Sequence, residues 1–195
     1  MASSGRRLTL SPIGFDIVLA LSQAPEGLRL ADLSHIIGSP VSSVQTALRV
    51  LIANSLVRRP SVEPPRYSLA DDHPARDELA SLATVLPEPA HAIAVILRAN
   101  PMISFAAVDK AGFLVSERRA AANHAAGEAL DHHLALVAQA RPGSPGLLRM
   151  SEEEFKRILR VGVGLRARVQ KAVTLKGRSP ADAPGEAEDR ARHAG

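Results

Sequence analysis

The chain has 195 residues, a net charge of +4 and no cysteine. A hydrophobic content of 46% is enough for one large domain or two small ones. The absence of Cys excludes disulfides, Cys-based zinc or iron–sulfur sites and thiol redox switches. Aromatic residues make up only 3% and Trp is absent, which argues against base stacking on aromatic platforms. No stretch approaches the ~18 apolar residues of a membrane span, so we expect a cytoplasmic protein with no membrane partner.

Two short helices and a strand are expected before residue 38. Ser11-Pro12 is a typical helix start, and apolar residues recur at helical spacing over 12–22. A short strand is expected over 28–30 and a two-turn helix over 31–37. Gly38 can close that second helix, because glycine adopts the left-handed conformation of a C-cap at little cost.

A longer helix and a hairpin follow. Ser39 is expected to cap a helix over 40–54, with Pro40 at its first position. Within that helix a buried stripe recurs at positions i, i+4 and i+7, formed by Val44, Leu48 and Leu51. Two strands, 56–59 and 66–69, are expected on either side of the Pro-rich turn PSVEPP.

The rest of the chain carries weaker patterns. We expect helices over 75–85, 90–100 and 117–140, strands over 103–108 and 113–115 joined by the turn Asp109-Lys110-Ala111-Gly112, and a last helix opened by Ser151 and Glu154. Gly162 and Gly164 favour a break in that last helix. Residues 179–195 lack apolar periodicity, which predicts a disordered tail.

If the stripe of the 40–54 helix faces the core, its polar side chains face solvent. Such a helix fits a DNA major groove, where Gln, Ser, Thr and Arg reach base edges or phosphates. We expect base-edge contacts from Ser43, Gln45 and Thr46, and phosphate contacts from Ser42, Arg49 and the hairpin residues Arg58, Arg59 and Arg66. The alternative is a solvated polar surface, and residues 1–70 are only mildly basic, with seven basic and four acidic residues.

The order of these elements is more specific than any one residue. The segments LADLSHIIGSPVSSVQTALRVLIANSLVRR and RYSLADDHP resemble the winged helix-turn-helix of ArsR/MarR-type bacterial transcriptional regulators. The resemblance implies that residues 40–54 are the recognition helix and residues 57–69 the wing. The turn has Pro64-Pro65 in place of the usual Gly-rich tip, and the Cys metal-sensing motifs of ArsR members are missing.

Three alternatives concern the second half. It faintly resembles a minimal nucleotidyltransferase-like domain, but no Gly-Ser pair follows the strand that ends at Val108, so any such domain would be inactive. His124, Glu128 and His132 share a helix face with metal-ligand spacing, for which a solvated face is the favoured interpretation. The basic last helix is interpreted as a surface helix, with a phosphate-binding surface or a dimerisation arm as the alternative.

The sequence thus predicts an α+β protein and a sequence-specific regulator of transcription that binds double-stranded DNA as a homodimer. The expected domains are a winged helix-turn-helix over 8–74, a small, mostly helical or α/β dimerisation/regulatory domain over 75–178, and a tail over 179–195. No enzymatic activity, cofactor or metal is expected. A winged-helix module for protein contacts is the main alternative, and a nucleotidyltransferase-like enzyme is the weaker one.

Overall fold

A computed structural model describes residues 9–60, 64–118, 124–141 and 143–177. They form two compact units. The first holds the chain up to Met102 together with helix α6 (His124–Ala140), and the second holds residues 103–118 and those from Gly146 onward. Helices with a two-stranded hairpin, followed by a mixed sheet with helices, confirm the expected α+β class. The tail expected over 179–195 lies outside the described residues.

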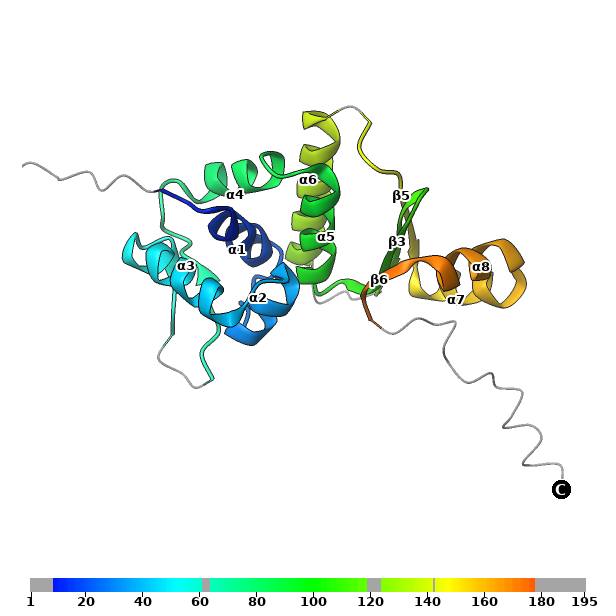
Figure 1. Cartoon of the computed structure of the whole chain (residues 1–195), viewed down its shortest axis with the longest axis horizontal. Helices are drawn as coiled ribbons and strands as arrows, with labels where there is room; N and C mark the ends of the chain where they lie inside the picture. Colours follow the sequence, from blue (N-terminus) through cyan, green and yellow to red (C-terminus); the bar gives the residue numbers. More distant parts are fainter. Residues whose placement is uncertain (1–8, 61–63, 119–123, 142, 178–195) are drawn as a thin grey trace, which may run out of the picture. The chain divides into compact units, whose positions relative to one another are not determined.

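The first unit begins with a helix-turn-helix and a hairpin. Helices α1 (Pro12–Ser22), α2 (Leu30–Ile37) and α3 (Val41–Ala53) precede strands β1 (Val57–Arg58) and β2 (Ser68–Leu69), which pair antiparallel. As expected, Ser11 caps α1, and Gly38 ends α2 with a φ of 73°. Helix α1 packs against both α3 and α4 (Arg76–Val85) and lies between them (Figure 1).

Two local expectations in this region are wrong. The strand expected over 28–30 is a single bridge between Leu28 and Tyr67, and α2 already begins at Leu30 because the Asp32 carboxylate accepts the backbone N–H of Arg29 at 3.2 Å. Pro40, not Ser39, is the N-cap of α3. The backbone N–H of Ser39 donates to the carbonyl of Ser34 at 3.2 Å, so Ser39 belongs to the end of α2.

The core of the first unit extends past residue 74, where the sequence predicted the end of the winged-helix domain. Helices α4 and α5 (Pro89–Ala99) pack against α1, and α6 packs against both of them. Asn100 holds α6 in place with a fully buried side chain. Its amide donates to Gln23 Oε1 at 3.1 Å and to the carbonyl of Ala126 at 2.7 Å. Residues 9–74 therefore share one core with three further helices.

His133 also joins α6 to α1, and its pKa is lowered chiefly by burial. One ring nitrogen lies 2.7 Å from the carbonyl of Ala129 and the other 3.2 Å from Ser22 Oγ. A neutral ring donates from Nδ1 to the carbonyl of Ala129. Its Nε2 accepts from Ser22 Oγ only when that hydroxyl, which also lies 2.8 Å from the carbonyl of Leu19, turns its one proton toward the ring. Because the folded state disfavours the charged ring, the unfolded chain takes up this proton first as the pH falls.

We expect the stability of the first unit to fall as the pH drops below about 6.5, the ordinary histidine pKa, and His133→Gln to flatten that dependence. The measurement is the midpoint of urea unfolding between pH 7.5 and pH 5, followed by the fluorescence of Tyr67, which is buried in this unit and is the only Tyr in a chain without Trp. Exposed His132→Gln is the matched control. Equal pH dependence in wild type and His133→Gln would contradict the assignment.

The second unit is a four-stranded sheet with the order β5-β4-β3-β6. Strands β3 (Ile103–Asp109) and β4 (Gly112–Glu117) form the expected hairpin, and β4 pairs parallel with β5 (Leu147–Ser151). Helices α7 (Glu152–Val161) and α8 (Val163–Lys171) precede the edge strand β6 (Val173–Lys176). The sheet packs on the helices through Phe105 and Phe155, whose stacked rings lie 5.2 Å apart.

The sequence mispredicted parts of this unit. The sequence predicts neither β5 nor β6, and both are edge strands without a regular buried alternation. The helix expected over 117–140 begins later, because Glu117 ends β4 and is ion-paired with Arg149. The break expected in the last helix is confirmed, since Gly162 separates α7 from α8. Ser151 and Glu154 form the expected capping box.

In the described part of the chain, no single helix combines the length and apolar character needed to cross a membrane. Helices α2 and α3 meet those two criteria only as a pair, bent by 111° at their junction.

Candidate nucleic-acid interface

Helix α3 presents a polar stripe because its opposite side is fixed in the core. Val44, Leu48 and Leu51 are almost fully buried, as expected. With 100° of rotation per residue, the positions diametrically opposite this stripe are 42, 46 and 49. Ser42, Thr46 and Arg49 are accordingly exposed and follow one another along the outer face. Thr46 Oγ1 donates to the carbonyl of Ser42 at 2.9 Å.

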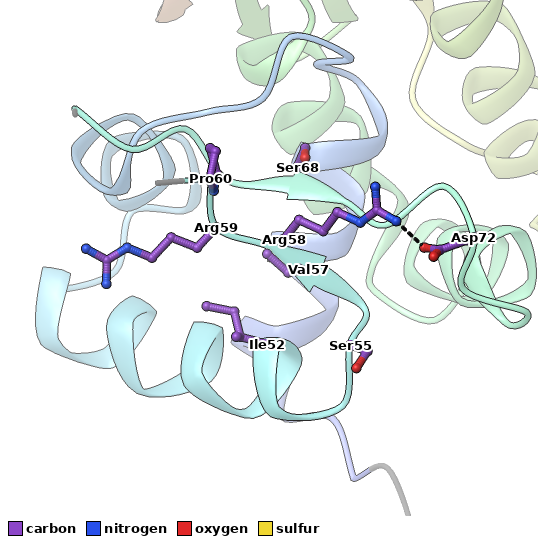
Figure 2. Close-up of a pocket in the computed structure, with 8 residues that line it drawn as sticks. All are labelled: Ile52, Ser55, Val57, Arg58, Arg59, Pro60, Ser68 and Asp72. Carbon is purple, nitrogen blue, oxygen red and sulfur yellow. Dashed lines mark hydrogen bonds and ion pairs between the residues drawn. The ribbon is translucent and has the colours of Figure 1, made fainter. Parts of the chain in front are cut away.

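The two remaining candidates on α3 lie on opposite flanks of this stripe. Gln45 is exposed and lies two turns before Ile52, which lines a hollow together with Arg58 and Arg59 of the hairpin (Figure 2). Gln45 is therefore on the flank that faces the hairpin. Ser43 is half-buried on the other flank, where it lines a second hollow beside the start of α1. The structure separates these two expected base-contacting residues by the width of the helix.

Arg58 in β1 and Arg59 directly after it point in different directions. The guanidinium of Arg58 donates to Asp72 Oδ1 at 2.6 Å in an exposed ion pair, and the side chain of Arg59 extends away from it on the side of α3 (Figure 2). Within the described residues, neither Arg59 nor Arg49 has a hydrogen-bonded or ion-paired side-chain partner. Of the four arginines proposed on α3 and the hairpin, Arg49 and Arg59 are thus the two whose guanidinium groups have no such contact in the described structure.

Arg66 has a structural contact of its own. It lies outside β2, and its guanidinium donates to the carbonyl of Gly27 at 3.1 Å. The backbone of Gly27 lies close to Tyr67, since a Cβ added at Gly27 would lie 2.7 Å from the Tyr67 carbonyl oxygen. Arg66 therefore ties the hairpin to the loop between α1 and α2. The tip of the expected wing, residues 61–63, lies outside the described residues.

Sequence reasoning missed Asp72 as part of this surface. It lies 14 residues after Arg58 in the chain, and nothing in the spacing signals that hairpin pairing brings the two side chains together. Asp72 partly neutralises the hairpin. No acidic residue occurs in the sequence from Leu33 to Val62, and Glu63 follows in the hairpin tip, outside the described residues.

Asp72→Asn is expected to strengthen binding to any double-stranded DNA by roughly two- to fivefold, because an exposed ion pair contributes up to about 1 kcal/mol and its loss frees Arg58 for a phosphate. The measurement is fluorescence anisotropy with a mixed-sequence duplex. Asp71→Asn, which breaks the neighbouring exposed pair with Arg76, is the matched control. An Asp72→Asn affinity equal to that of the control would show that Arg58 takes no part.

Three helices with the third one exposed, followed by an antiparallel hairpin, define a winged helix-turn-helix. Residues 13–61 match the family model of the IclR helix-turn-helix domain. This segment is similar to the helix-turn-helix domain of IclR-type regulators, which implies a DNA-binding regulator of transcription. The winged helix-turn-helix expected from the sequence is confirmed, but the matching type is IclR and not the ArsR/MarR type. No curated protein and no solved structure matches the chain.

Domains of this class are typically non-enzymatic. In the second unit, Asp109 and Glu117 are the acidic residues of the hairpin formed by β3 and β4. Both are ion-paired, Asp109 with Arg168, whose guanidinium lowers the pKa of that carboxyl, and Glu117 with Arg149. His124 pairs with Glu128 at 3.1 Å. Among the described residues, no three His, Cys, Asp or Glu side chains gather closely enough to hold a metal ion.

Proposed function

We propose that this protein regulates transcription by binding double-stranded DNA sequence-specifically, with α3 in the major groove and the hairpin on the phosphate backbone. The observation that carries the proposal is the exposed stripe of Ser42, Thr46 and Arg49, which is flanked on the hairpin side by Gln45 and Arg59. A major groove admits one helix, and these side-chain types pair with base edges and phosphates.

The geometry refines the role of each residue in this proposal. Gln45 and Thr46 contact base edges, and Gln45 is suited to a bidentate pair with adenine. Arg49 and Arg59 contact phosphates, as does Ser42 through its hydroxyl. Ser43 contributes at the rim, since it is half-buried. Arg58 and Arg66 act once their contacts with Asp72 and Gly27 rearrange.

Recognition by one helix covers only half of a typical operator, so we propose that the protein binds as a homodimer to a two-fold symmetric site. The helices that follow the hairpin, α4, α5 and α6, supply the surface for that contact. The regulatory role proposed for the second half, 75–178, then rests on the sheet of the second unit. The proposed dimer surface is assigned to these helices because a two-fold symmetric site requires two copies of the protein, and because α3 and the hairpin are already occupied by DNA in the proposal.

Gln45→Ala is expected to lower affinity for a selected operator by about 1–3 kcal/mol, because the partnered adenine loses its bidentate contact, and to change affinity for random DNA little. The measurement is competition between the two duplexes at fixed salt. Exposed Ala53→Gly, at the end of the same outer face, is the control for a change in helix stability. An equal loss of affinity on both duplexes would contradict direct base contact by Gln45.

A second candidate function is protein contact through the same helix. Val41 and Val50 support it, since they are 48% and 41% exposed on α3 and lie beside the polar stripe. Apolar side chains on an exposed helix face favour a protein partner, whereas the unpaired cations favour DNA. Retention of DNA binding in Val41→Ser with Val50→Ser would support the DNA interface, and loss of binding with the fold intact would favour the protein contact.

A further inference from the structure

The two helices of the second unit meet at an exposed apolar turn. Val161 ends α7 and Val163 begins α8, and they are 79% and 83% exposed, the highest values among the large apolar residues of the described chain. Gly162 keeps the turn tight, because its backbone N–H donates to the carbonyl of Ile158 at 2.6 Å and a Cβ on it would lie 2.7 Å from that oxygen. Both valines are thus presented to solvent, and we call residues 161–163 the tip.

The tip lies away from the sheet. Helix α7 follows β5 directly and α8 ends one residue before β6, so the tip is at the far end of both helices, about 15 Å along α7 from the end of β5. Figure 1 shows the two helices meeting at the end that points away from the strands of this unit. Their buried side packs on the sheet through Phe155, Leu159 and Val169, and neither valine belongs to this core. The tip is therefore a protrusion outside the core of the second unit.

Positive charge collects around the tip. From Phe155 to Gly177 the sequence contains seven Lys and Arg residues and no Asp or Glu. Arg157 is exposed one turn before Val161 and on the same face of α7, and the exposed Arg160 lies between them in the sequence. The last turn of α7 therefore presents two guanidinium groups beside this valine.

Arg166 brings a third guanidinium group to the tip from α8. It is exposed one turn after Val163, and it donates to the carbonyl of Leu159, near the end of α7, at 2.8 Å. The acidic residues of α7 lie at its other end, since the glutamates at 152–154 form its first turn, at least about 10 Å along the helix from the tip. The two ends of α7 thus carry opposite charges, with the basic end at the tip.

Apolar side chains surrounded by arginines fit an anionic lipid surface. Headgroup phosphates pair with guanidinium groups, and exposed apolar side chains enter the boundary between headgroups and acyl chains. The backbone of a nucleic acid would satisfy the arginines but would leave the valines in water. A stable protein–protein interface buries about 1,000 Å² or more, which is a large area for a single turn between two helices. A membrane needs no such matching surface.

We propose that the tip binds peripherally to membranes that contain anionic lipids, with Val161 and Val163 in the interfacial layer and Arg157, Arg160 and Arg166 on headgroup phosphates. The expectation of no membrane partner rests only on the lack of a spanning segment, which a peripheral contact does not need. The inference goes beyond the proposed function and is independent of it, since it uses no residue of α3 or of the hairpin.

The first test is sedimentation of the full chain with vesicles of phosphatidylcholine that contain about 30% phosphatidylglycerol, at about 0.1 M salt. Wild type is expected to bind these vesicles and to bind pure phosphatidylcholine at least about tenfold more weakly. Arg157→Gln with Arg160→Gln is expected to lower partitioning about 25-fold, because each cation near an anionic surface contributes about fivefold. Absence of binding by folded wild type would overturn the proposal.

A charge-matched control assigns this effect to the tip. Lys110→Gln with Lys171→Gln removes two exposed cations of the same unit, and Lys171 lies about 12 Å along α8 from Val163, beyond the screening length of roughly 10 Å. Its partitioning is expected to stay within about threefold of wild type. A loss as large as that in Arg157→Gln/Arg160→Gln would show that net charge, and not the tip, attracts the protein to the vesicles.

The valines are tested separately. Val161→Ser with Val163→Ser is expected to lower partitioning roughly tenfold, because the apolar area that enters the interfacial layer is lost. The thermal midpoint is expected to stay unchanged, since both side chains are exposed. Val173→Ser, at an exposed position of β6, is the matched control and is expected to bind as wild type. Unchanged partitioning of Val161→Ser/Val163→Ser would contradict insertion of the tip.

A second measurement locates the tip in the lipid. Because the chain has no Trp, Val161→Trp carries a single indole at the tip, and Lys110→Trp carries one outside it. We expect the emission of Val161→Trp to shift to the blue on anionic vesicles and to be quenched by brominated acyl chains, and that of Lys110→Trp to stay unchanged. No shift in Val161→Trp on vesicles that it binds would overturn the proposal.

DNA provides the last comparison. We expect Arg157→Gln with Arg160→Gln to bind a mixed-sequence duplex as wild type does, because the tip is assigned to lipid. A loss of duplex affinity as large as the loss of vesicle binding would assign these arginines to nucleic acid and overturn the lipid contact. Failure of wild type to bind any duplex would count against the proposed function alone and leave the vesicle results standing.

Discussion

Arg49→Ala with Arg59→Ala is expected to weaken binding to every duplex about 30-fold at 0.15 M salt and to lower the salt slope by about 2. Each phosphate contact releases about 0.9 of a counterion, which corresponds to roughly a fivefold change in affinity at that salt concentration. These two cations are exposed and have no ion-pair partner in the described chain, so their charge is free for phosphates. The measurement is anisotropy titration between 50 and 300 mM salt, roughly the range over which such slopes are linear.

Two comparisons sharpen this result. Arg157→Ala with Lys171→Ala removes the same charge from exposed positions of the second unit and controls for net charge. Arg58→Ala is expected to have a smaller effect than Arg59→Ala, because Asp72 already partly neutralises Arg58. If wild type binds a duplex with a steep salt slope and Arg49→Ala/Arg59→Ala has the same slope, then neither the polar stripe of α3 nor the hairpin contacts phosphates through these arginines.

Leu48→Ala is expected to cost the first unit about 2–5 kcal/mol of unfolding free energy. Leu48 is 1% exposed and is the middle residue of the stripe that fixes α3 in the core, so its truncation leaves a cavity beneath the recognition helix. Urea unfolding followed by the fluorescence of Tyr67 measures the loss in this unit, because Tyr67 is the only Tyr and Trp is absent.

Val50→Ala is the matched control for this variant, since Val50 lies on the same helix and is 41% exposed. Its cost is expected to stay within about 0.5 kcal/mol. At temperatures where Leu48→Ala remains folded, we expect its DNA affinity to stay close to that of wild type. A loss of stability in Val50→Ala as large as that in Leu48→Ala would mean that α3 is not fixed by its buried stripe.

The local signals of the helix-turn-helix made it predictable. Ser11-Pro12, Gly38 and the spacing of Val44, Leu48 and Leu51 each determine structure within a few residues, and all three produced the expected elements. Two details were wrong: the strand expected over 28–30 is a single bridge between Leu28 and Tyr67, and the cap of α3 was misplaced by one residue. There the sequence could not reveal that the backbone of Ser39 is engaged by the carbonyl of Ser34.

Contacts between distant residues were not predictable. Strand β5 exists because Leu147 to Ser151 pair with β4, and no local pattern marks those five residues as a strand. For the same reason the sequence placed Arg58, Arg59 and Arg66 in one basic hairpin without the contacts to Asp72 and Gly27 that engage two of them. The sequence also predicts the same role for Gln45 and Ser43. They are distinguished only by the residues beside each flank of α3, the hairpin next to Gln45 and the start of α1 next to Ser43.

Selection of bound duplexes from a random double-stranded pool tests the central claim most directly, because it requires α3 to distinguish base sequences without assuming an operator. We predict enrichment of an inverted repeat whose half-sites lie about one helical turn apart, or a multiple of it, and loss of that enrichment in Gln45→Ala. Recovery of unenriched sequences by the folded wild-type protein would contradict the account.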